Sequence, residues 1–148
     1  MKNIISEIKI KYQPIKLGNG NIKIRSSNDA YDVILKHWNK DTIELQEEFK
    51  VLLLNNSNEV LGIYEMTKGG MTSTLVDVKL LFAVVLKSCA TAIITVHNHP
   101  SGKLKPSESD KVIFRKIKEI SNLLDINYLD NLIITQKGKY SFNDECMN

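Results

Sequence analysis

The stretch TAIITVHNHPSG, residues 91–102, decides how this chain folds. Its first six residues are β-branched or small and uncharged, which is typical of a central strand covered on both faces. His97 and His99 follow directly. In an extended chain, residues i and i+2 point the same way, about 6.6 Å apart, so two such imidazoles can converge on one zinc ion. Pro100 then turns the chain away, which leaves both histidines at the edge where open α/β sheets bind ligands.

A third zinc ligand is expected on the helix predicted over residues 106–124. Apolar residues spaced four, three and four apart form the core stripe of this helix: Ile113, Ile117, Ile120 and Leu124. Extending the stripe backwards by three residues reaches Asp110. A carboxylate on the inward face of a helix is costly unless a charge or a metal pairs with it. Because a catalytic zinc usually keeps three protein ligands and one water, we predict that His97, His99 and Asp110 hold a zinc ion.

Ser107 lies one helical turn before Asp110 and has two interpretations. The segment PSESD, residues 106–110, is a good helix start in which Ser107 serves as the N-cap. Paired histidines also occur on ordinary protein surfaces. Each fragment alone favours the structural interpretation, whereas HxHP, SxxD and an inward-facing aspartate together favour a metal site.

Hydrolysis also requires a base for the water that zinc activates. Glu47 and Glu48 both precede a strand predicted over residues 49–54. Alternation of side chains places Glu47 on the apolar face with Phe49, and Glu48 on the face of Lys50, with which it can form an ion pair. We therefore predict Glu47 as the general base.

The rest of the chain alternates between strands and helices. The other predicted elements are a strand over residues 4–10, a helix over 26–38, a hairpin of strands 49–54 and 60–66, a helix over 76–87, and a closing hairpin of strands 133–135 and 140–142. His37 is expected to complement the dipole at the end of its helix. We predict a three-layer α/β/α fold with a mixed sheet, in which residues 1–40 are a lead-in packed on the core of residues 41–148.

Composition excludes several classes of protein. The 148 residues suffice for one packed domain. A net charge of +3 without a dense basic block does not point to a nucleic-acid partner, so any binding to nucleic acid is expected to be weak. Cys89 and Cys146 stand alone, so a disulfide scaffold is not expected, and Cys89 is predicted to be buried. Charges interrupt every apolar run of the N-terminal MKNIISEIKIKYQ, so we expect no signal peptide, no membrane span and a cytoplasmic location.

HNHPSG followed by PSESD resembles the JAMM signature, H-x-H-P-x-G with a downstream S-x-x-D. The stretches EEFKVLLLN, VDVKLLFAVVLKSCATAIITVHNHPSG and LLDINYLDNLIIT resemble the RadC-type branch of JAB/MPN proteins, over roughly residues 40–148. The resemblance implies a cytidine-deaminase-like fold around zinc. His97, His99 and Asp110 match the metal ligands, Glu47 the catalytic glutamate, and Ser107 the serine that stabilises the tetrahedral oxyanion.

Two departures from the family pattern bear on function. RadC-type proteins usually carry a helix-hairpin-helix segment before this domain, and residues 1–40 show no such pattern, which weakens an inherited role in DNA repair. The family often has Asp-His where this chain has Asp130-Asn131. Neither departure touches the predicted metal ligands.

Three functions compete. The leading hypothesis is a zinc-dependent hydrolase of peptide or isopeptide-like amide bonds, whose protein or peptide substrate presents an extended chain end, because JAMM relatives act on ubiquitin-like tails. Gly69-Gly70 is read as a flexible connection in preference to a substrate contact. The alternative is a RadC-type DNA-repair-associated accessory protein without its own peptidase activity, disfavoured because no groove-reading helix is evident. A scaffold that keeps zinc only for stability would need neither Glu47 nor Ser107. The sequence predicts no oligomeric state.

Overall fold

The computed structural model describes residues 5–7, 9, 20–69 and 76–146. Its elements, in chain order, are α1 (Ser27–Lys36), β1 (Glu48–Leu54), β2 (Val60–Lys68), α2 (Val78–Lys87), β3 (Ala92–Asn98), α3 (Glu108–Leu123), β4 (Asn127–Thr135) and β5 (Gly138–Ser141). The predicted helices and both predicted hairpins are therefore present. The strand predicted over residues 4–10 lies largely outside the described residues, and residues 5–7 and 9 are not in a strand.

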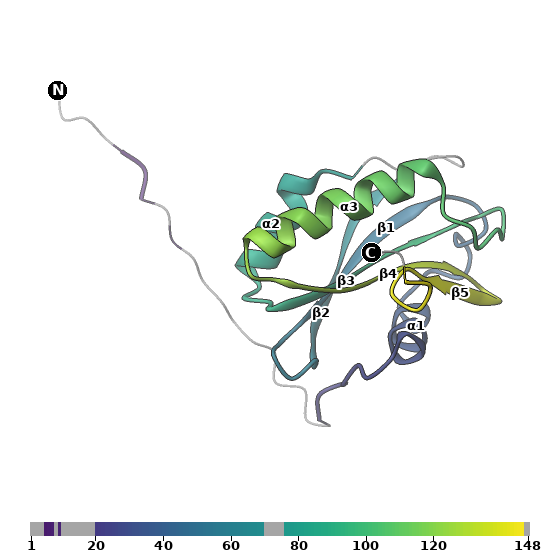
Figure 1. The fold of residues 1–148 in the computed structure, drawn as a ribbon, viewed down its shortest axis with the longest axis horizontal. Coiled ribbons are helices and arrows are strands. Elements are labelled where there is room, and N and C mark those ends of the chain that lie inside the picture. Colours follow the sequence, from purple (N-terminus) through teal and green to yellow (C-terminus); the bar gives the residue numbers. More distant parts are fainter. Residues whose placement is uncertain (1–4, 8, 10–19, 70–75, 147–148) are drawn as a thin grey trace.

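The strands form one mixed sheet in the order β2-β1-β3-β4-β5. β1 runs antiparallel to both β2 and β3, β3 and β4 are parallel, and β5 returns antiparallel to β4. A parallel pair needs a long crossover connection, which α3 supplies between β3 and β4. One face of the sheet is covered by α1 and the other by α2 and α3 (Figure 1). The predicted three-layer α/β/α architecture with a mixed sheet is confirmed.

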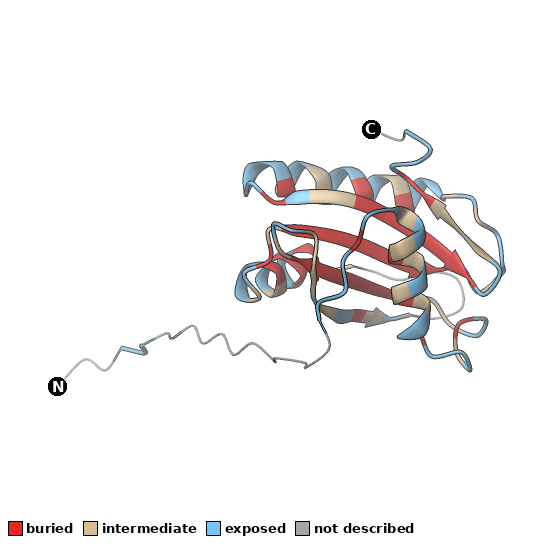
Figure 2. Ribbon diagram, turned by 90° about the horizontal axis from the view of Figure 1, so that it is seen from below, coloured by how far each residue is buried: buried red, intermediate tan, exposed pale blue. Residues whose placement is uncertain are grey.

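Side-chain alternation along the central strands divides the core in two. All seven residues of β1 and all seven of β3 are buried, as a strand covered on both faces requires (Figure 2). Leu52 and Ile94 pack with Ile34 of α1, whereas Val51 and Ile93 pack in the cluster beneath α2 and α3. The predicted central strand is confirmed, and it continues two residues further than expected, through His97 and Asn98.

Local capping explains where the helices begin and end. The side chains of Ser26 and Asp77 accept hydrogen bonds from backbone N–H groups of the first turns of α1 and α2. His37 follows the last residue of α1, and its Nδ1 lies 2.8 Å from the carbonyl oxygen of Val33. His37 therefore interacts with the end of its helix, where the sequence places it.

Two sequence predictions on burial are corrected. The buried line of α3 consists of Asp110, Phe114, Ile117 and Ser121, whereas Ile113 and Ile120 are half-buried and Leu124 is exposed. The reason is that α3 packs on two clusters at once, with Phe114 beside Phe142 and Ile113 on the side of α2. Cys89 is exposed, because it lies beyond the packed face of α2 in the turn that follows this helix, where its φ is 57°.

Two further observations concern the chain as a whole. The segment around α1 packs on the sheet through Ile24, Ala30, Ile34 and Trp38, while a boundary at residue 40 stays a prediction. Among the described residues, no helix combines the length and the apolar character needed to cross a lipid bilayer.

Candidate metal centre

His97 belongs to β3 itself, and its side chain is buried. Its ring stacks on Phe49 of β1, with ring centroids 6.1 Å apart and planes 9° apart. Phe49 and His97 are direct partners in the β1–β3 ladder, so backbone pairing brings the two rings together. The Nδ1 atom of His97 has no hydrogen-bond partner among the described residues. Stacking on Phe49 therefore orients this ring.

His99 lies just beyond β3, and its own loop orients it. Its Nδ1 lies 2.7 Å from the carbonyl oxygen of Lys103. Because a carbonyl only accepts hydrogen bonds, Nδ1 carries a proton, and in the neutral tautomer Nε2 presents a lone pair. The loop returns toward His99 through Gly102, which adopts φ +78° and donates its N–H to the His99 carbonyl at 3.0 Å.

Asp110 reaches the two histidines from the first turn of α3. Its Oδ1 lies 3.2 Å from Nε2 of His97, and its Oδ2 lies 3.3 Å from Nε2 of His99. The two Nε2 atoms are 3.1 Å apart. The end of a strand and the start of a helix thus direct three side chains toward one point.

These separations fit a tetrahedral metal ion. Ligands at about 2.0–2.1 Å from zinc stand about 3.3–3.4 Å from one another along the edges of a tetrahedron. The two Nε2 atoms are 3.1 Å apart, and each lies 3.2 or 3.3 Å from one of the two carboxylate oxygens of Asp110. Imidazole lone pairs and a carboxylate at such distances repel unless a proton or a cation lies among them. Two histidines and one carboxylate are also a donor set that catalytic zinc sites use.

Glu47 is the fourth member of the cluster. It lies directly before β1, and one ligand atom each from Glu47, His97, His99 and Asp110 all lie within 4.8 Å of one another. Burial raises the pKa of Glu47 above its ordinary value, although the charges of His97 and His99 oppose the rise. A carboxylate with a raised pKa holds a proton more readily near neutral pH.

Charge coupling is strong among the predicted ligands. Burial by itself would raise the pKa of Asp110, but hydrogen bonds from His97 and His99 hold that pKa far below its ordinary value. Burial by itself would lower the pKa of His99, yet the hydrogen bonds to Asp110 and to the Lys103 carbonyl raise it. The imidazoles of His97 and His99 therefore stabilise the ionised form of the Asp110 carboxyl group.

Glu48 faces away from this cluster and is almost completely buried, 1% exposed. The predicted ion pair with Lys50 is not formed. Glu48 instead pairs with Lys68, at 4.0 Å, and Lys50 pairs with Glu65, at 3.5 Å. Lys68 is the direct partner of Glu48 in the β1–β2 ladder, and such cross-strand neighbours are closer than residues i and i+2 of one strand.

Ser107 is the N-cap of α3 and is bonded to Asp110. Its Oγ accepts the N–H of Asp110 at 3.1 Å, and its own N–H donates to Oδ2 of Asp110 at 2.7 Å. This capping box satisfies two N–H groups at the helix start and orients the carboxylate that faces the histidines. Ser107 is not one of the four clustered donors, and a contact with an oxyanion stays a prediction.

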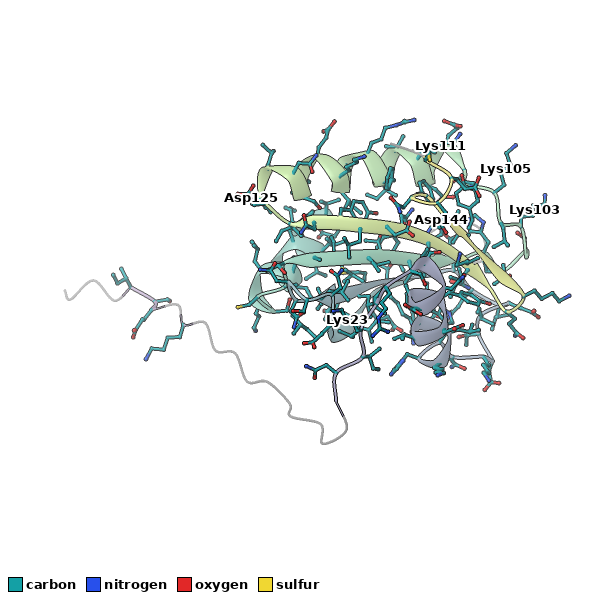
Figure 3. The ribbon with its side chains drawn as sticks, turned by 60° about the horizontal axis from the view of Figure 1, so that its bottom comes forward. Lys23, Lys103, Lys105, Lys111, Asp125 and Asp144 are labelled. Atoms are coloured by element: carbon teal, nitrogen blue, oxygen red, sulfur yellow. The ribbon has the colours of Figure 1, made fainter. Side chains whose placement is uncertain are left out.

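Lysine side chains lie on the loop that follows His99 and at the start of α3. Lys103 and Lys105 of this loop and Lys111 of α3 lie at one end of the molecule, away from Asp125 at the far end of α3 (Figure 3). Lys111 is bound to Glu108 at 2.9 Å. Lys103 and Lys105 are exposed.

Sequence reasoning missed one residue of this region, Asn98. It stands between the two histidines and is completely buried. The available signal was alternation, which directs the side chain between two ligands of one strand to the opposite face of the sheet.

The comparisons with known proteins agree on one family. The sequence profile described as "RadC-like JAB domain" matches residues 24–147. A UPF0758 protein of Flavobacterium johnsoniae is 46% identical over 129 residues, which are 83% of this chain and 52% of the relative. A UPF0758 protein of Chlorobium phaeovibrioides is 34% identical, over 85% of this chain and 55% of the relative.

A third relative, a UPF0758 protein of Porphyromonas gingivalis, is 41% identical over 68% of this chain and 44% of its own length. The chain thus spans about half the length of the curated relatives that it matches.

Proposed function

Because this chain belongs to the RadC-like JAB domain family and gathers four side chains that could hold a metal ion, we propose that it is a zinc-dependent hydrolase of peptide or isopeptide-like amide bonds. His97, His99 and Asp110 would hold the ion. When bound, zinc supplies Lewis acidity, which makes water a better nucleophile and polarises the amide carbonyl. Every other step falls to side chains of this chain.

Glu47 is the proposed proton carrier. Its carboxylate takes a proton from the attacking water and delivers it to the nitrogen of the amide bond that breaks. The raised pKa of Glu47 supports this role, because the group must hold the proton between the two transfers. The products are a free carboxyl group and a free amine.

Ser107 is the proposed oxyanion donor. Its hydroxyl oxygen accepts the N–H of Asp110, which leaves the hydroxyl hydrogen to be directed to the oxygen of the scissile carbonyl. A donor placed where negative charge develops lowers the barrier of acyl transfer. The capping box keeps Ser107 next to Asp110, and so beside the metal-binding atoms.

One observation carries the proposal. The donor atoms of Glu47, His97, His99 and Asp110 lie within 4.8 Å of one another, although the residues come from three separate parts of the chain. A structural zinc site needs ligands alone and closes with four of them. Here a half-buried glutamate beside three ligands provides the base that hydrolysis requires.

The substrate class is part of the proposal. We propose a protein or peptide that presents an extended chain end, and we place the enzyme in the cytoplasm. The alternative function, an accessory protein of DNA repair without peptidase activity, rests on the family label and on no contact of the described residues.

Metal content and cleavage test the proposal together. The chain is purified free of metal, titrated with zinc, and incubated with a peptide library derived from a whole proteome. We expect one zinc per chain and cleavage only in its presence. The double variant His97→Ala, His99→Ala should lose both. His37→Ala changes the one other histidine of the chain and should keep both. Zinc stoichiometry that survives the double substitution would overturn the ligand assignment.

A further inference from the structure

Asn98 lies between the two predicted histidine ligands in the chain, but its side chain is directed to the opposite side of the sheet. The backbone ladder between β1 and β3 ends at the pair Phe49 and His97. The next pair in this register would be Glu48 and Asn98. The Glu48 N–H donates instead to the side chain, 2.7 Å from Oδ1 of Asn98. The carboxamide therefore takes the place of a backbone partner at the end of the ladder.

The nitrogen of the same carboxamide binds the turn before β1. Nδ2 of Asn98 donates to the carbonyl oxygens of Ile43, at 2.6 Å, and Gln46, at 2.8 Å. The two donors and the oxygen of the carboxamide are all engaged, in a side chain with no exposed surface. Rotating the amide by half a turn would set its oxygen against two carbonyl oxygens, so only one orientation satisfies this site.

These hydrogen bonds are made by the peptide groups on both sides of Glu47. The carbonyl of Gln46 belongs to the peptide group before Glu47, and the N–H of Glu48 belongs to the peptide group after it. One carboxamide thus fixes both peptide planes on either side of the Glu47 Cα atom. From the end of β2, the N–H of Gly69 adds a third bond, 2.7 Å long, to the carbonyl oxygen of Glu47.

We propose that Asn98 is a positioning residue, which sets the Glu47 carboxylate against the metal ligands by holding the backbone on both sides of Glu47. The effect of Asn98 on turnover rests on the proposed function, whereas its hydrogen bonds to the backbone do not. Asn98 is joined in the chain to both His97 and His99, so its position is tied directly to that of the two predicted ligands. A single residue thereby joins the strand that carries the ligands to the segment that carries the base.

The chemistry of the site explains why asparagine is needed. Aspartate would face the carbonyl oxygens of Ile43 and Gln46 with a negative oxygen, and leucine would leave all three backbone groups without partners. A hydroxyl side chain is too short to reach both sides. A residue that only filled space would instead tolerate leucine, which has a similar shape.

The experiment compares Asn98→Ala with Ile34→Ala. Ile34 is equally buried and shares a hydrophobic cluster with Ile43, so its substitution tests a loss of packing without removing the hydrogen bonds of Asn98. Three quantities are measured at temperatures that give both variants the same fraction folded. They are hydrogen exchange of residues 43–49, zinc stoichiometry, and kcat and KM on a quenched fluorescent peptide library.

For Asn98→Ala we expect faster exchange of residues 43–49, one zinc per chain, and a kcat lowered on the order of a hundredfold with little change in KM, because a base displaced by about 1 Å loses its alignment. Ile34→Ala keeps the hydrogen bonds of Asn98 and should keep both zinc and kcat. In a Glu47→Gln background, Asn98→Ala should lower the residual kcat no further, since the group that it positions is already absent.

Several results would overturn the proposal. These are unchanged exchange of residues 43–49, loss of zinc from Asn98→Ala, or an undiminished kcat despite faster exchange. If the wild-type protein with zinc cleaves no peptide, the proposed function fails. A crystal structure of Asn98→Ala then decides the positioning role by whether Glu47 has left the histidines. If Asn98→Ala does not fold, Asn98→Ser is carried through the same measurements.

Discussion

Glu47 and Glu48 are adjacent in the chain and meet opposite environments. Glu47 faces the histidines and Asp110, within the 4.8 Å cluster of donor atoms. Glu48 is buried on the other face of the sheet, where it pairs with Lys68. Successive residues of an extended segment point to opposite sides, so a shift of one residue would exchange the two. The pair therefore offers a matched test of the catalytic proposal.

We expect Glu47→Gln to retain zinc and to lose turnover, by about a hundredfold or more, because the substitution removes a general base and no ligand. Glu48→Gln is the control, and it should remain active while its stability changes. Zinc stoichiometry, thermal melting and turnover are measured for both variants. An inactive Glu48→Gln beside an active Glu47→Gln would show that the face assignment is wrong.

Ser107 has a structural contact and a predicted catalytic one, and two substitutions separate them. If Ser107 serves only as an N-cap, Ser107→Ala costs about 1 kcal/mol of stability, and Ser107→Asp is tolerated because aspartate caps well. If its hydroxyl donates to the oxyanion, Ser107→Ala should cost on the order of a hundredfold in turnover. Ser107→Asp should then also be inactive, since a carboxylate repels the oxyanion.

We expect the second pattern, because the capping box holds Ser107 against Asp110. Paired thermal melts and turnover assays on both variants decide between the two, with zinc affinity measured alongside to detect any displacement of Asp110. An active Ser107→Asp enzyme would reduce Ser107 to a cap.

At the scale of elements, the hairpin of β4 and β5 is closed by a buried carboxyl group. Oδ2 of Asp130 accepts the hydroxyl of Ser141 at 2.5 Å, and Oδ1 accepts the N–H groups of Asn131 and Asn143. Burial raises the pKa of Asp130, although the hydrogen bonds from Ser141, Asn143 and Asn131 oppose the rise. The folded state therefore binds this proton more tightly than the unfolded chain does.

This shift predicts how stability depends on pH. The contribution of Asp130 is fully present below its unfolded pKa of about 3.9 and is lost as pH rises through the higher folded pKa. Asp130→Asn cannot titrate, so its free energy of unfolding should improve relative to wild type as pH rises through this range. Ser141→Ala removes a bond that lowers the pKa, and should steepen the decline. Urea unfolding of the metal-free proteins across this pH range measures both, and a constant difference between Asp130→Asn and wild type would contradict the assignment.

At the scale of the whole molecule, charge bears on the alternative function. The net charge is +3 over 148 residues, and the lysines labelled near the site stand on one loop and one helix (Figure 3). Phosphate contacts dominate the affinity of proteins for DNA, and each one makes binding more sensitive to salt. A few exposed lysines therefore support only weak association.

We expect this protein to bind duplex DNA weakly and without sequence preference, with a Kd of about 10⁻⁶ M or weaker at physiological salt. Fluorescence anisotropy of two labelled duplexes of unrelated sequence, at low and at physiological salt, measures this. Submicromolar binding that persists at physiological salt would place the accessory role in DNA repair ahead of the hydrolase.

The sequence by itself determined the features that depend on a few neighbouring residues. The uncharged run before His97 identifies the central strand, because a strand buried on both faces cannot hold a charge without a partner. The spacing of His97 and His99, and the serine-to-aspartate spacing at the start of α3, selected side chains that the structure brings together. The periods of 2.0 residues in a strand and 3.6 residues in a helix depend only on neighbouring residues, so they can be recognised without knowing the fold.

Only the tertiary structure decided which distant residues meet. Glu48 pairs with Lys68 because β1 and β2 align them in one register, and no local pattern encodes that register. The buried row of side chains along α3 includes Phe114 because the helix packs on two clusters at once. Asn98 binds backbone groups about fifty residues away in sequence, at separations of 50, 52 and 55. Such contacts depend on how whole elements pack, which the period of a single element does not specify.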